Sequence, residues 1–225
     1  MRRILIALSG FWTLFILAGA ARADLLVNGD FSQGNTGFNS QYNYVLGNGT
    51  VFTSPGNYGV INNPASAFTN PYASFGDHTS GSGLMLFADG AGAGTNVWSE
   101  IVSVGAGECT FTGWIANGNI MLSNPATLTL FVNGSQAGSP FAISQLGGVW
   151  QEWAAHLNFQ AASSITLSIE DVNPNPFGFG NDYAIDDLSL TTEQVVTTPE
   201  PSSLLLTGSG LLLLATMFRR KLLDR

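Results

Sequence analysis

The middle of this chain alternates apolar and polar side chains over short segments. Because successive side chains of a β-strand point to opposite faces of a sheet, such alternation predicts strands with one buried face. In one segment the apolar face consists of Ala126, Leu128, Leu130 and Val132. We expect seven strands of this kind, at Leu84–Ala88, Val97–Val104, Cys109–Ala116, Ala126–Val132, Glu152–Phe159, Ser164–Glu170 and Tyr183–Leu190.

Turn-forming residues separate these segments. Asn-Gly or Gly-Gly pairs stand at residues 117–118, 133–134 and 147–148. Many short strands with such turns, and no long segment with the helical period, are typical of a β-sandwich or jelly roll. We therefore expect residues 24–192, called the passenger domain below, to form one all-β domain, a jelly-roll β-sandwich. The pattern is irregular in residues 33–83, where we expect large loops.

Residues 1–23 have the pattern of a secretory signal peptide. Arg2 and Arg3 precede an apolar run over residues 4–17, and Ala21 and Ala23 are the small residues that signal peptidase requires before its cut. An uncleaved N-terminal anchor is the alternative, but the run is shorter than the ~20 residues of a spanning helix. We expect signal peptidase to cut after Ala23.

A Pro-Glu-Pro motif stands in residues 193–203, a linker that follows the passenger domain. Its residues are Pro199, Glu200 and Pro201. Because prolines interrupt regular structure, we expect the motif to be exposed and accessible to a protease.

A single hydrophobic helix and a basic tail are expected after this linker. Residues 204–218 are apolar and, together with the two serines before them, would span roughly 25 Å as a helix, just short of a typical hydrocarbon core. The tail, residues 219–225, begins with Arg219, Arg220 and Lys221. Such a basic cluster stays cytoplasmic, which leaves the passenger domain on the far side of the membrane.

The order and spacing of this motif, apolar segment and basic cluster resemble the PEP-CTERM sorting signal of Gram-negative bacteria that make exopolysaccharide. The resemblance implies that an exosortase, a membrane cysteine protease, recognises the tail and cuts near the Pro-Glu-Pro motif. A plain C-terminal membrane anchor with a chance Pro-Glu-Pro is the alternative.

The charge distribution narrows the partners of the passenger domain. All seven Lys and Arg residues lie in the first 22 or the last 7 positions. Between Asp24 and Thr198 there are 13 carboxylates, eight Asp and five Glu, and no basic side chain. Nucleic acid and anionic lipid would repel such a domain, whereas neutral polysaccharide, cations and other proteins remain as partners.

Two segments at the ends of the passenger domain resemble the first and last strands of galactose-binding-like jelly rolls, the fold of many carbohydrate-binding modules. They are Leu26–Phe31 and Tyr183–Leu190. The resemblance implies a β-sandwich with affinity for sugars.

A structural Ca²⁺ is one consequence that we expect. If Leu188 and Leu190 face the core, alternation turns Asp186 inward, where no Lys or Arg is present to pair with it. Carboxylates and backbone carbonyls suit Ca²⁺. The related jelly rolls often hold such an ion between their first and last strands, which implies Asp30 or the backbone carbonyls of Asn28 and Gly29 as further ligands. Ser32 stands where an acidic residue is common in that family, so a hydrogen-bonded Asp186 without a metal is an equal alternative.

Sugar binding would require exposed aromatic side chains beside polar ones. The candidates are Tyr42, Tyr44, Tyr58, Trp150, Phe177 and Phe179. Three other tryptophans lie within predicted strands, where large aromatics are usually buried, so we expect them in the core: Trp98, Trp114 and Trp153. We also expect Cys109, the one cysteine, to be buried.

Catalysis has little support. His78 and His156 lack the spacing of a transition-metal site, and the Gly-x-Ser-x-Gly motif of hydrolases is absent. We therefore predict a non-enzymatic protein, exported to the cell envelope or extracellular matrix, that binds or associates with exopolysaccharide. The alternatives are a structural or adhesive surface protein without glycan affinity, held by its C-terminal anchor, and a glycan-active enzyme.

Overall fold

The computed structural model describes residues 23–45, 54–67, 72–120, 124–173, 180–192 and 208–211. Residues 22–194 form one compact unit, which contains both sheets and their hydrophobic clusters. Several residues of the predicted sites lie outside the described residues: Ala21, Phe177, Phe179, Pro199, Glu200, Pro201, Arg219, Arg220 and Lys221. Residues 208–211 form a helical turn, and no described helix has the length and apolarity to cross a membrane.

Six strands form one sheet in the order β1-β2-β3-β10-β5-β8. Neighbours are antiparallel except for β1 and β2, which are parallel. The strands are β1 Asn43–Tyr44, β2 Asn57–Ile61, β3 Met85–Asp89, β10 Asp182–Thr192, β5 Gly107–Asn117 and β8 Trp150–Phe159.

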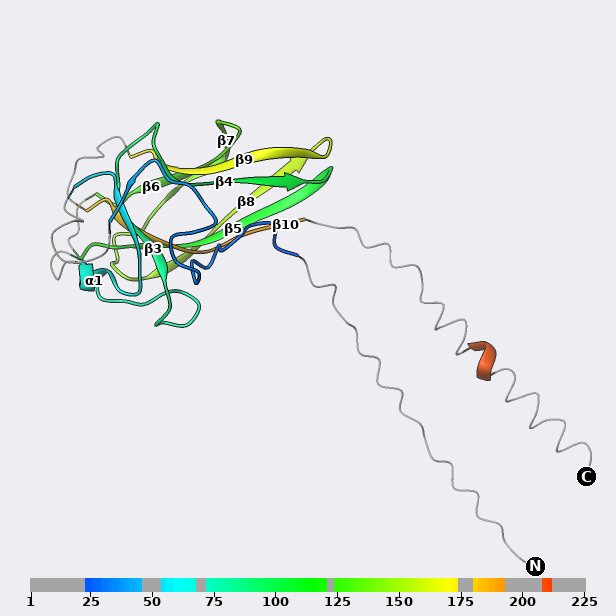
Figure 1. Cartoon of the computed structure of the whole chain (residues 1–225), viewed down its shortest axis with the longest axis horizontal. Helices are drawn as coiled ribbons and strands as arrows, with labels where there is room; N and C mark the ends of the chain where they lie inside the picture. The colour runs from blue at the N-terminus through cyan, green and yellow to red at the C-terminus, as the bar shows by residue number, and fades with distance from the viewer. Residues whose placement is uncertain are drawn as a thin grey trace, which may run out of the picture. The chain divides into compact units, whose positions relative to one another are not determined.

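Four antiparallel strands form the second sheet in the order β4-β9-β6-β7. They are β4 Asn96–Val104, β9 Ser163–Asp171, β6 Thr127–Val132 and β7 Ser135–Ala142. The short helix α1, Pro64–Ala67, follows β2. The two sheets lie face to face as the layers of a jelly-roll β-sandwich (Figure 1). The predicted fold class is confirmed.

The core lies between the two sheets. Trp98 of β4 and Phe111 of β5 are fully buried there, and Trp153 of β8 packs edge-on against Phe111 with ring centroids 5.4 Å apart. Burying a side chain of this size stabilises the fold by roughly 1.5–3 kcal/mol. Cys109 is also buried in this cluster, as predicted.

All seven predicted strands are confirmed, each with ends within two residues of the prediction. Three observed strands were not predicted: β1, β2 and β7. Almost every residue of β7 is exposed, so the strand has no buried face to produce an alternating pattern. The strands β1 and β2 are short and lie in the polar region that predicted only loops.

The segment Leu26–Phe31 is not a strand, contrary to the resemblance. Asn28 and Phe31 have φ angles of 56° and 51°, which bend the chain away from an extended path. The segment nevertheless follows the edge of β10, because Leu25 donates to the Leu190 carbonyl and Leu188 donates to the Gly29 carbonyl, both at 2.9 Å. Direct backbone hydrogen bonds thus join the two ends of the domain.

A β-bulge interrupts β10. The register with β5 shifts between Asp186 and Ser189, and Asp187 has a φ of 47°. Ala184 before the bulge belongs to a second cluster on the outer face of the six-stranded sheet, whereas Leu188 after it lies in the core. Asp186 is buried but does not share a face with Leu188, so the predicted inward orientation is wrong.

Candidate functional site

Trp114 lies half-exposed on the outer face of the six-stranded sheet, the face that points away from the core. The side chains of β5 that belong to the core are Cys109, Phe111 and Ile115. Alternation therefore places Trp114 on the opposite face, and the expectation that it is a core residue is wrong. Its cross-strand partners are Asp186 of β10 and Glu152 of β8, so the three form a row across three strands.

The imidazole of His78 stacks on the Trp114 indole. The ring centroids are 3.8 Å apart and the planes differ by 11°. His78 belongs to residues 76–83, which we call the strap, and the Trp150 indole N–H donates to the Gly76 carbonyl at its start, with 3.2 Å between the atoms. The strap therefore crosses the outer face over Trp114 and beside Trp150.

Two neighbouring carboxylates of β10 hold the strap in place. The backbone N–H of His78 donates to Asp186 Oδ2 at 2.8 Å, and His78 Nδ1 lies 2.7 Å from Asp187 Oδ2. The Thr79 hydroxyl donates to Asp187 Oδ1 at 2.6 Å. In a regular strand, two successive side chains point to opposite faces of the sheet. The bulge in β10 lets Asp186 and Asp187 both bond the strap.

The strap is also ordered by its own hydrogen bonds. The Asp77 carboxylate accepts the backbone N–H groups of Ser80 and Gly83, at 3.0 and 2.6 Å. Burial alone would raise the pKa of Asp77, but these hydrogen bonds outweigh it and lower the pKa below its ordinary value. An ionised Asp77 thus pre-organises the turn that presents His78.

Asp186 has the most perturbed environment in this site. Burial, and to a smaller extent the charge of Asp187, raise the pKa of Asp186 to about 7 against the opposing effect of the hydrogen bond from the His78 N–H. Its second oxygen, Oδ1, is buried and has no hydrogen-bond partner among the described residues. Asp186 therefore exchanges a proton near neutral pH directly beneath the strap.

Short side chains continue the outer face beyond Trp114. The register places Ser189, Thr112 and Ala154 in the next row, and Thr191, Thr110 and His156 in the row after it. These residues are exposed or half-buried. We call this surface the small-residue strip; it lies on β10, β5 and β8, with the Trp114–His78 pair at one end.

Of the aromatic candidates from the sequence, the four that the structure describes, Tyr42, Tyr44, Tyr58 and Trp150, do not form one platform. Tyr42 and Tyr58 are both only 5% exposed. The Tyr42 hydroxyl accepts the Ala91 N–H, and burial raises the pKa of Tyr42 to about 12. Tyr44 is 42% exposed on the edge strand β1 and packs on Tyr58. Among the described candidates, Trp150 is the one that borders the Trp114 site.

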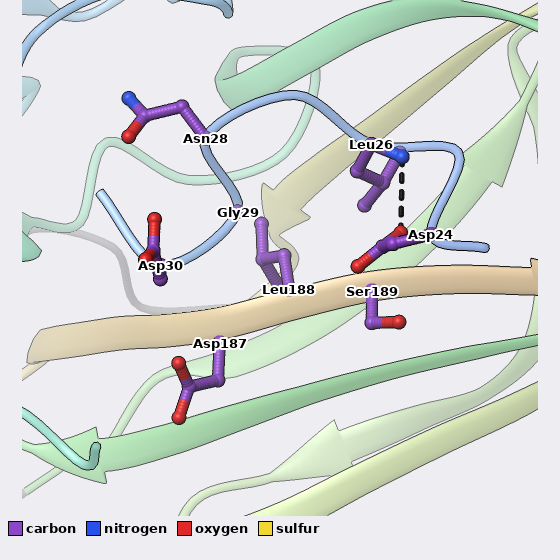
Figure 2. A pocket seen from close by; sticks show the side chains of 8 residues that line it. All are labelled: Asp24, Leu26, Asn28, Gly29, Asp30, Asp187, Leu188 and Ser189. Carbon is purple, nitrogen blue, oxygen red and sulfur yellow. Dashed lines mark hydrogen bonds between the residues drawn. The ribbon is translucent and has the colours of Figure 1, made fainter. Parts of the chain in front are cut away.

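A pocket of about 340 Å³ opens beside β10, where the N-terminal segment follows its edge. Asp24, Asp30 and Asp187 contribute carboxylates to its lining, together with Ser189. Figure 2 shows Asp187 and Ser189 on one side of β10 and Leu188 on the other. The pocket is therefore acidic, and through Asp187 it adjoins the strap.

The two carboxylates predicted to hold Ca²⁺, Asp30 and Asp186, do not share the lining of this pocket. Asp30 lines the pocket but Asp186 does not, and Asp30 accepts the N–H and hydroxyl of Ser32 instead. Among the residues that the structure describes, no group of three or more His, Cys, Asp or Glu side chains is placed to hold a metal ion. The direct backbone bond between Gly29 and Leu188 makes the connection that the ion was expected to make.

No family model and no curated protein matches this chain. Solved structures with some similarity include the sugar-binding EclA C-terminal domain, at 20% identity and a TM-score of 0.36 over 43% of this chain and 66% of that one. A tandem CBM22 domain of Paenibacillus barcinonensis Xyn10C matches at 16% identity and a TM-score of 0.47, over 82% of this chain and 49% of that one. The xylan-binding CBM22-2 domain of the same protein matches at 14% identity and a TM-score of 0.43, over 73% and 97%. This chain thus spans two thirds or less of the first two, and similarities this low assign neither family nor function.

The residues that build this site could be found only in part from the sequence. The alternation within Cys109–Ala116 already places Trp114 opposite Phe111 and Ile115, and that signal was available. The sequence contains no comparable signal for His78, because its contacts with Asp186 and Asp187 join residues more than one hundred positions apart.

Proposed function

We propose that this chain is an exported, non-enzymatic module that binds neutral exopolysaccharide through the outer face of its six-stranded sheet. One observation supports the proposal above the others. Trp114 is only partly buried and stacks with His78, which bonds the carboxylate of Asp187, on a sheet face that continues as the small-residue strip.

This arrangement suits the two surfaces of a sugar ring. Because His78 already covers the face of the Trp114 indole, the apolar face of a pyranose would pack against the exposed edge of the Trp114–His78 stack. The sugar hydroxyls would donate to carboxylates such as Glu152 and Asp187. Short side chains on the strip leave room for further sugar units along the strands. Because the passenger domain has no basic side chain, anionic polysaccharides are repelled and neutral ones are favoured.

The hydrogen bonds around His78 support a binding role over a catalytic one. In a nucleophilic triad the histidine contacts the hydroxyl and the carboxylate orients the histidine. Here the Thr79 hydroxyl donates to Asp187 and not to the imidazole, so this pair anchors the strap and does not activate a nucleophile.

Export and sorting complete the proposal. The signal peptide of residues 1–23 takes the chain through the inner membrane, and the Pro-Glu-Pro tail is cut by an exosortase-type protease. The intact mass of the protein from its producing organism tests this: an end near residues 199–203 is expected, and a mature chain that still ends at Arg225 makes the tail a permanent anchor.

Affinity electrophoresis tests glycan binding. The passenger domain is run through native gels that contain a neutral polysaccharide (xylan or the producing organism's own exopolysaccharide) or an anionic one (alginate). We expect retardation by a neutral polymer and none by alginate. Unchanged mobility in all of these gels would contradict the proposal.

A structural or adhesive role without glycan affinity is the second candidate, and one surface favours it. Ile120, Leu146 and Val149 are 55%, 62% and 46% exposed. Their two loops lie side by side, because Gly148 donates to the Asn117 carbonyl at 2.8 Å. Three exposed aliphatic side chains on adjacent loops suit a contact with another protein.

A further inference from the structure

Glu100 is a buried carboxylate with an unsatisfied oxygen. Its side chain lies on β4 under the N-terminal segment and is 7% exposed. Glu100 Oε1 accepts the backbone N–H of Val27 at 3.0 Å, whereas Oε2 is buried without a hydrogen-bond partner among the described residues. A buried carboxylate in this condition is costly, because it has lost water and gained only one donor.

Asp24 is fixed close to this group. Asp24 Oδ1 accepts the backbone N–H groups of Leu26 and Leu190, at 3.0 and 2.9 Å. The Leu26 bond fixes the Asp24 side chain three residues before Val27, whose N–H bonds Glu100. Burial raises the pKa of Glu100, the Val27 bond opposes this, and the charge of Asp24 raises it further, so the two carboxylates act on each other.

The passenger domain offers no side chain to neutralise these carboxylates. It contains no Lys or Arg from residue 24 to residue 198. The pocket beside Asp24 adds the carboxylates of Asp30 and Asp187 (Figure 2). A positive charge at Asp24 would therefore lie near several carboxylates, with no basic side chain of the passenger domain to repel it.

We propose that cleavage of the Ala23–Asp24 bond supplies this cation: the new α-ammonium group of Asp24 pairs with the buried Glu100 carboxylate. Signal peptidase hydrolyses the bond with water, the hydroxyl goes to the Ala23 carbonyl, and the Asp24 nitrogen becomes an amine that is protonated at neutral pH. The inference rests on the export step of the proposed function. It goes further by assigning the new terminus a structural partner.

Processing then stabilises the passenger domain. Before the cut, the Asp24 nitrogen is an uncharged amide and Glu100 Oε2 stays unsatisfied. After the cut, every described hydrogen bond of Asp24 remains and one ion pair is added. The precursor is thus less stable than the mature domain, which suits a chain that must cross the membrane unfolded.

Thermal unfolding of two forms of residues 24–194, the compact unit that holds both sheets and both hydrophobic clusters, tests the inference. One form begins at Asp24 after removal of a fusion partner, and the other carries a Gly-Ala extension before Asp24. We expect the free terminus to melt about 3 °C higher or more at pH 6.5, and the difference to vanish at pH 10, where the amine is neutral. Equal melting temperatures at pH 6.5 would overturn the inference.

The Glu100→Gln variant in both forms identifies the partner. We expect the two forms to melt at the same temperature in this background, and an undiminished difference would assign the effect to another carboxylate and overturn the pairing with Glu100. Should Glu100→Gln fail to fold, an NMR titration of the wild-type α-amino group decides. A pKa at least one unit above the ordinary value of about 7.7–8.0 is expected, and an ordinary pKa would overturn it. The melting and NMR experiments use recombinant protein. Their results therefore test the Asp24–Glu100 pairing independently of glycan binding and of export in the producing organism.

Discussion

At the scale of single residues, buried carboxylates without basic partners distinguish this domain. Asp89 of β3 lies opposite Asp182 of β10. The charge of Asp89 also contributes to raising the pKa of Tyr42 and of Tyr183. Burial and then the charge of Asp182 raise the pKa of Asp89 to about 8. Burial also raises the pKa of Asp182 to about 6, against the hydrogen bond from Asn119. Both groups hold protons in the folded state that an unfolded chain releases near pH 4.

The stability of the domain should therefore fall as the pH rises from about 4 to about 8. In this window the unfolded state binds fewer protons than the folded state, so each such group weakens the fold by up to about 1.4 kcal/mol per pH unit. Urea unfolding at several pH values measures the slope, and Asp89→Asn should reduce it. Glu108→Gln, on the exposed end of β5, is the control. A free energy of unfolding that stays flat or rises across this window would contradict the account.

At the scale of elements, the contact between the N-terminal segment and β10 holds the domain's two ends together. A Cβ atom on Gly29 would lie 1.9 Å from the Leu188 carbonyl oxygen, so only glycine permits this approach. The main-chain oxygen cannot move without breaking the neighbouring bond from Leu188 to Gly29.

We expect Gly29→Ala to destabilise the domain by about 3 kcal/mol or more, because the clash is with backbone. Gly105→Ala is the matched control, since nothing lies within 4 Å of its added Cβ and its φ is not in the left-handed region. Denaturant unfolding of the two variants compares them, and equal stabilities would show that the N-terminal segment does not need this contact.

Strands with one buried face could be predicted from the sequence. The orientation of individual side chains and the position of the loops could be predicted only in part. Alternation located β3, β4, β5, β6, β8, β9 and β10 because each packs one face on the core. It failed at Asp187, where one extra residue in β10 exchanged the faces of everything after it. It also gave no account of the strap, whose position depends on hydrogen bonds between distant residues and not on periodicity.

At the scale of the whole molecule, an acidic β-sandwich lies between two end segments that we propose direct its export and sorting. Because residues 24–198 contain no basic side chain, we expect the passenger domain to repel anionic polymers, and the proposed α-ammonium group of Asp24 would supply the cation for Glu100. We propose the outer face around Trp114 as the surface for a neutral glycan.

The most direct measurement of this central claim is affinity electrophoresis of Trp114→Ala in the neutral polysaccharide that retards the wild type. Ile101→Ala is the control, because Ile101 is 69% exposed and lies on β4 of the other sheet. We predict that Trp114→Ala loses most of the retardation, about tenfold or more in apparent affinity, because truncating a large aromatic side chain at the centre of a binding site costs about 1.4 kcal/mol or more. Ile101→Ala should behave as wild type. Wild-type retardation of a folded Trp114→Ala would place glycan binding elsewhere and contradict the site proposed here.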